Sequence, residues 1–148
     1  MGTKRQKPGK GTRKMRSNSS LVAFQKEISV TFLEMLMMVK LFHWKTTDYS
    51  THKATDDLYT KLNANVDEFI EILLGKSGSR INLQERKMNL IDLSNQESLK
   101  KEIVRFKEYL VGLNENKAML SMSNTDLFNV RDTILGNLNQ FLYLLTFK

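Results

Sequence analysis

Four side chains that could bind a metal ion recur at regular intervals in one segment of the sequence. His52 and Asp56 are four residues apart, and so are Asp67 and Glu71. In an α-helix this interval places both members of a pair on one face, one turn above the other. Asp56 and Asp67 are eleven residues apart, close to three full turns, so all four side chains are expected along one stripe of a helix.

These two pairs are too far apart along a single helix to hold the same ion. The eleven residues between Asp56 and Asp67 span about 16 Å along a helix axis. Metal–ligand bonds to nitrogen or oxygen are only about 2 Å long. One helix therefore cannot complete a metal site with these four residues.

A symmetric arrangement of two chains could complete the site, because the four residues are placed symmetrically about one point in the sequence. His52 and Glu71 are centred between Lys61 and Leu62, and so are the two aspartates of the stripe. If two copies of the helix packed antiparallel about a two-fold axis at this point, His52 would face Glu71 of the partner subunit. The sequence predicts either two identical sites of one imidazole and three carboxylates, suited to iron, manganese or zinc, or an ordinary solvated face.

The same residues carry a resemblance to the Dps family, the ferritin-like DNA-binding proteins of starved cells. That family's signature is His-Trp, then His-x3-Asp-x10-Asp-x3-Glu, around an iron-oxidising site at a two-fold subunit interface. His43 and Trp44 match the first part, although His43 precedes the next histidine by nine residues, three fewer than in the family, and is the weaker candidate ligand. The remaining ligands keep the family's spacing: His52, Asp56, Asp67 and Glu71.

The resemblance implies a ferritin-like four-helix bundle, a homodimer, bound iron and iron(II) oxidation as the enzymatic activity. The chain also resembles uncharacterised ferritin-like proteins encoded by large DNA viruses. In the Dps family a short helix lies at the dimer interface between the second and third long helices. In the corresponding segment here, 76–93, Gly78 and several polar residues indicate a loop, and Leu90, Ile91 and Leu93 indicate a patch that packs on the core, whereas the resemblance suggests such a helix.

Apolar residues at three- and four-residue intervals independently predict an all-α fold of four helices, at 20–45, 51–75, 95–114 and 124–147. The ligand stripe (His52, Asp56, Asp67 and Glu71) lies about 130° around the second helix from its apolar seam, so the stripe should face outward. We expect Trp44 in the core, a capping box at Ser94–Glu97, and a helix end at Gly75. The predicted core residues are Leu21, Phe24, Ile28, Phe32, Met35, Val39 and Phe42, Leu58, Leu62, Val66, Phe69 and Leu73, Leu99, Ile103, Phe106, Leu110 and Leu113, and Leu127, Val130, Ile134, Leu138, Phe141 and Leu145.

The positive charge of the chain is concentrated at its start. The 148 residues have a formal net charge of +7, and the seven basic residues of the arm (1–19) account for all of it. With few apolar side chains, the arm is expected to be disordered unless a partner orders it, while 20–148 forms the bundle. It is either a solubilising tail or nuclear-import signal, or an element that binds DNA or an acidic protein surface. Its basic residues are Lys4, Arg5, Lys7, Lys10, Arg13, Lys14 and Arg16.

The residues that the sequence lacks exclude several classes of enzyme and a membrane-spanning segment. There is no cysteine, no Ser-His-Asp set and no glycine-rich phosphate loop, so redox chemistry at a metal is the only enzymatic chemistry the sequence supports. No apolar run is long enough to cross a bilayer, and we expect no membrane partner. Two functions from different classes remain: a Dps-like metal- and DNA-binding protein of the cytoplasm or nucleus, or a structural component of a virus particle whose arm holds its neighbours.

Overall fold

The computed structural model describes the backbone of residues 11–147 and the side chains of residues 19–147. All regular structure in this part of the chain is helical, as predicted. Residues 1–10 of the predicted arm lie outside the described residues, and the first helix begins at Gly11, nine residues before its predicted start. The helices are α1 (Gly11–Lys45), α2 (Tyr49–Ser77), α3 (Gln96–Gly112), the short α4 (Lys117–Leu120), which the sequence did not predict, and α5 (Thr125–Leu144).

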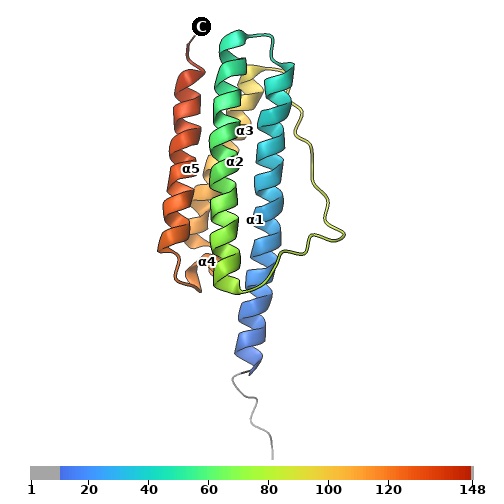
Figure 1. The fold of residues 1–148 in the computed structure, drawn as a ribbon, viewed down its shortest axis with the longest axis vertical. Coiled ribbons are helices and arrows are strands. Elements are labelled where there is room, and N and C mark those ends of the chain that lie inside the picture. Colours follow the sequence, from blue (N-terminus) through green and yellow to red (C-terminus); the bar gives the residue numbers. More distant parts are fainter. Residues whose placement is uncertain (1–10, 148) are drawn as a thin grey trace, which may run out of the picture.

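The four long helices lie side by side around one core (Figure 1). α2 packs on α1 and on α5, and α3 packs on α5. A tight turn joins α1 to α2, which run in opposite directions. The connector (78–95) then returns along the length of the molecule, so α3 runs in the same direction as α2, and α5 runs back (Figure 1). The first turns of α1 extend beyond the end of α2.

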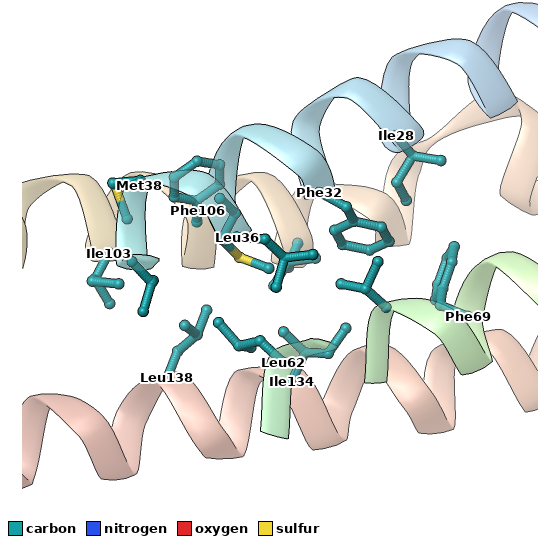
Figure 2. Close-up of a cluster of buried hydrophobic side chains, with 14 of the residues drawn as sticks. Ile28, Phe32, Leu36, Met38, Leu62, Phe69, Ile103, Phe106, Ile134 and Leu138 are labelled. Atoms are coloured by element: carbon teal, nitrogen blue, oxygen red, sulfur yellow. The ribbon is translucent and has the colours of Figure 1, made fainter. Parts of the chain in front are cut away.

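The predicted core is confirmed almost completely. Every residue of the four apolar seams is buried except Leu21, which is partly buried against the core. Figure 2 shows side chains of α1, α2, α3 and α5 meeting in this core. Phe32 of α1 and Phe69 of α2 make an edge-to-face contact, with ring centroids 5.3 Å apart and an interplanar angle of 82°. This packing fixes the rotation of α2 and therefore determines which of its side chains face outward.

The predicted end of the second helix and the predicted capping box of the third helix were also wrong. α2 continues through Gly75 to Ser77, and the chain turns at Gly78, which has φ of 69° and donates its N–H to the Leu74 carbonyl oxygen. Gly78 is the glycine that adopts the left-handed conformation of a helix C-cap, whereas Gly75 has no positive φ. At the start of α3 the cap is Asn95, whose side chain accepts a hydrogen bond from the Ser98 N–H at 2.8 Å, so the predicted capping box, one residue earlier, is not formed.

Substituting the two glycines of α2 is expected to change stability in opposite directions. Gly78→Ala should lower the free energy of unfolding by about 1 kcal/mol, because a Cβ is disfavoured at positive φ. Gly75→Ala should raise it by about 0.5–1 kcal/mol, because alanine loses less backbone entropy in a helix and its Cβ meets nothing within 4 Å. Urea denaturation with an unchanged m-value measures both. A stabilising Gly78→Ala would contradict the assignment of this C-cap.

The connector contains no helix, which corrects the expectation of a short helix within 76–93. Instead, the second half of the connector is attached to the helices. Asn89 donates its N–H to the Glu34 carboxylate at 3.1 Å, and Ile91 and Leu93 pack against the core. Leu90, between these anchors, is 62% exposed. Ile91 and Leu93, which pack on the core, are two residues apart, a spacing that places side chains on one face of an extended chain and not on one face of a helix.

No helix in the described part of the chain combines the length and apolarity needed to span a bilayer.

Candidate metal site on the outer face of α1 and α2

The start of α2 is fixed by Asp48, its N-cap residue. The Asp48 carboxylate accepts hydrogen bonds from the Thr51 hydroxyl at 2.7 Å, the Ser50 hydroxyl at 3.0 Å and the Ser50 N–H at 3.3 Å. The hydrogen bonds from Thr51 and Ser50 hold the pKa of Asp48 below its ordinary value. Thr51 and Thr55 are buried against the rest of the protein, so His52, between them in sequence, is directed outward.

His43 and His52 stack on each other across the turn between α1 and α2. Their ring centroids are 3.9 Å apart and their planes differ by 16°. Each ring's Nδ1 lies against the other residue's carbonyl oxygen: His43 Nδ1 is 2.9 Å from the His52 oxygen, and His52 Nδ1 is 3.0 Å from the His43 oxygen. A carbonyl oxygen can only accept, so both Nδ1 atoms carry hydrogen. In each neutral ring the lone pair is then on Nε2.

These contacts are reciprocal, but the two histidines differ in exposure: His52 is exposed and His43 is half-buried. The His43 carbonyl fixes the tautomer and orientation of His52, as outer-shell groups do for metal-binding histidines. Because the rings are nearly parallel, an ion in the plane of one ring lies out of the plane of the other. Both rings therefore cannot bind one ion with good geometry unless one of them turns. His52, which is exposed and lies on the ligand stripe, is therefore the better-placed candidate ligand, and His43 is a candidate positioning residue.

The other members of the ligand stripe are also directed outward. His52, Asp56, Asp67 and Glu71 are all exposed, in agreement with the angle between stripe and seam. No group of three or more metal-binding side chains comes together within the described part of the chain, as the axial separation of the two pairs requires. The three carboxylates of the stripe form no salt bridge with a described residue, whereas the adjacent Asp57 is paired with Lys61 at 2.9 Å. Within residues 19–147 the three carboxylates of the stripe thus form an exposed row of negative charge that no cation neutralises.

An exposed apolar stripe on α1, which the sequence reasoning missed, borders this row. Val22, Leu33 and Trp44 are exposed by 43%, 41% and 69%. They are eleven residues apart, so they lie on one face of the helix. One turn before Trp44, the Lys40 ammonium lies 4.1 Å from the ring centroid of Tyr59 in α2, so this face of α1 adjoins α2. The expectation of a buried Trp44 was wrong, because Trp44 is about 200° around the helix from the core residue Phe42.

The basic residues of the arm are only partly within the described structure. Arg13, Lys14 and Arg16 lie in the first two turns of α1, in the part that extends beyond the end of α2 (Figure 1). The other four lie outside the described residues: Lys4, Arg5, Lys7 and Lys10.

Comparison with known proteins gives a family but no function. No curated protein and no solved structure matches the chain. One family model matches residues 43–145, a stretch that begins at His43 and includes the whole ligand stripe. The chain therefore belongs to a family of unknown function, DUF5856.

Proposed function

We propose that this protein is a Dps-like protein, which binds iron or another divalent metal at a two-fold dimer interface and binds DNA through its basic arm. The main observation that supports metal binding is the orientation of the His52 ring. Its Nδ1–H is held by the His43 carbonyl at 3.0 Å, which leaves Nε2 as the ligand atom. His52 lies on the same exposed stripe as three carboxylates that pair with no cation among the described side chains. One neutral imidazole with three carboxylates fits iron, manganese or zinc.

The helix connectivity supports a ferritin-like four-helix bundle. Four long helices around one core can be joined by short turns throughout, or by one long crossover, as in ferritin-type bundles. Here residues 78–95 form one long crossover, and as a result α2 and α3 run in the same direction (Figure 1). The ligands nevertheless face away from the bundle interior, so a site would need a second subunit.

The outer face of α1 and α2 suits such a second subunit. Where the two-fold axis would cross the stripe, the exposed residues of α2 are Thr60, Asn63 and Ala64, whose short side chains allow two helices to approach closely. A second copy would also cover the apolar stripe of Val22, Leu33 and Trp44 on α1. In this arrangement each site receives His52 and Asp56 from one subunit and Asp67 and Glu71 from the other, and iron(II) bound there would be the substrate for oxidation.

Divalent metal is expected to strengthen the dimer. Sedimentation velocity with and without Zn²⁺, which has no redox chemistry to complicate the measurement, should show a shift from monomer towards dimer on metal addition. Asp56→Asn or Glu71→Gln should lower the apparent metal affinity by about tenfold or more, because each removes a ligand from both sites at once. The matched controls Asp57→Asn and Glu68→Gln remove the same charge from adjacent positions of α2 and should bind metal as the wild type does. Metal binding without dimerisation, or equal losses in all four variants, would contradict the proposal.

A second candidate function is a non-enzymatic structural component of a virus particle, either a minor capsid or a nucleoprotein component. It is favoured by exposed aromatic side chains away from the ligand stripe: Tyr49 at the start of α2, and Tyr143 and Phe147 near the end of α5. The rings of Tyr143 and Phe147 pack edge to face, 5.2 Å apart. A protein with two exposed apolar surfaces suits an assembly with several neighbours. This function requires no metal-dependent dimer, so the same sedimentation experiment separates the two candidates.

A further inference from the structure

A second group of basic residues lies on the connector, separate from the arm. Arg80, Arg86 and Lys87 are exposed, and none of them forms a salt bridge with a described residue. Glu85 is the only acidic residue between positions 78 and 91, so this segment is positively charged overall. Elsewhere in the described structure six cations are paired with acids: Lys45 with Asp92, Lys61 with Asp57, Lys76 with Asp126, Lys100 with Glu97, Arg105 with Glu102, and Arg131 with Asp132. The connector differs from other segments with unpaired lysines in that three such cations lie within eight residues of the chain.

Local hydrogen bonds order the backbone of the connector around Arg86 and Lys87. The Asn82 side chain accepts a hydrogen bond from the Gln84 N–H, and the Leu83 carbonyl accepts one from the Arg86 N–H, both at 2.9 Å. These bonds close a tight turn, after which the chain is anchored to α1 where Asn89 donates to Glu34. Because the turn is already ordered, binding a ligand there would cost little conformational entropy.

The turn lies between the end of α2, from which the connector leaves, and Glu34 of α1, to which Asn89 is anchored. The basic start of α1 extends past that same end of α2 (Figure 1). The contact between Phe32 and Phe69 sets the register of the antiparallel helices, so Ser77 at the end of α2 is level with about residue 24 of α1. Measured along the axis of α1 from the level of residue 24, the backbone of Arg16 is about 12 Å away and the start of the helix at Gly11 is about 20 Å away. Figure 1 shows the connector leaving α2 at this end of the molecule.

We propose that Arg80, Arg86 and Lys87 form a second phosphate-contacting element, which binds the same DNA duplex as the basic start of the chain. This inference rests on the DNA-binding half of the proposed function. Two basic elements more than 10 Å apart can be bridged by one duplex, because its phosphates form a continuous row with one charge per about 1.7 Å of helix axis. Phosphate contacts do not read bases, so the element adds affinity and orientation without sequence preference.

The salt dependence of DNA binding tests this proposal. Fluorescence anisotropy with a labelled 30-base-pair duplex would compare the full-length wild type with Arg80→Gln/Arg86→Gln/Lys87→Gln across a series of salt concentrations. Each phosphate contact contributes about 0.9 to the slope of log affinity against log salt, so the triple variant should lose about 2–3 units of slope. At about 100 mM salt its affinity should fall at least about tenfold. Its melting temperature should stay the same, because all three side chains are exposed.

A control variant separates specific contacts from the loss of net charge. Lys53→Gln/Lys100→Gln/Lys101→Gln removes three charges from the starts of α2 and α3, at the opposite end of the bundle, and should keep the wild-type slope (Figure 1). Equal slopes for wild type and the connector variant would overturn this inference alone. Two other outcomes would overturn the DNA-binding half of the proposed function. One is that the wild type binds DNA no better than an arm-deleted chain, and the other is that it binds polyglutamate in preference to DNA.

Discussion

Deleting residues 1–18 is expected to lower the affinity for duplex DNA by several orders of magnitude while leaving the fold nearly as stable as before. The deleted segment contains seven basic residues and no acid. Seven phosphate contacts would contribute about −6 to the slope of log affinity against log salt, which corresponds to a loss of roughly 10³–10⁴ in affinity between 50 and 200 mM salt. If the connector also contacts phosphates, the truncated chain should retain a slope of about −3 at low salt.

The fold should tolerate this deletion because, among the side chains that the structure describes, the buried residues of α1 begin at Phe24. The first turns of α1 extend past the end of α2, away from the core (Figure 1). Urea denaturation should therefore give a free energy of unfolding within about 0.5 kcal/mol of the wild type, the range typical of surface changes. A chain with the arm's seven cations replaced by glutamine is the matched control, and it should behave like the deletion. Undiminished DNA binding by the truncated chain would show that the arm is not the binding element.

The core could be predicted from the sequence because burial follows helical periodicity. Leu58, Leu62 and Phe69 recur at intervals close to whole turns, and all three are fully or almost fully buried. The outward direction of the ligand stripe follows from the same geometry. Trp44 was misplaced because its type favours burial, whereas its position on α1 puts it on the face opposite the seam. Periodicity was a better guide than residue type.

Features that depend on a single turn or cap were not predictable in this way. Gly75 and Gly78 are equally plausible helix ends in the sequence, and only the backbone conformation of Gly78, with φ of 69°, distinguishes them. The stacking of His43 on His52 depends on the three-residue turn between α1 and α2. The sequence interval of nine residues between the histidines gives no indication that their rings are in contact.

The proposed metal site requires a second subunit, and two observations favour one. The shared midpoint of the ligand stripe is a property of the sequence, and the exposed apolar stripe on α1 is a property of the structure. Both favour a second copy against the same face. They are independent observations, since the apolar residues Val22, Leu33 and Trp44 lie on a different helix from the ligands.

Phe69→Ala is expected to lower the free energy of unfolding by about 3–5 kcal/mol, the largest stability change among the variants considered. Phe69 is fully buried, and its ring meets Phe32 edge to face at 5.3 Å, so the substitution removes both apolar burial and a specific aromatic contact between α1 and α2. For a chain of this size the melting temperature should fall by roughly 8–15 °C. Thermal and urea denaturation measure these changes directly.

The same substitution should also weaken metal binding without removing a ligand. Phe69 lies in sequence between Asp67 and Glu71, on the opposite side of α2, and fixes the rotation of that helix against α1. A cavity there would loosen the half of α2 that presents both carboxylates, so the Zn²⁺-dependent dimer should form only at higher metal concentration. Phe147→Ala is the control: Phe147 is 54% exposed, and its loss should change the unfolding free energy by less than about 1 kcal/mol and leave metal binding unaffected. If Phe69→Ala destabilised the fold but bound metal as tightly as the wild type, the site would not depend on how α2 is packed against α1.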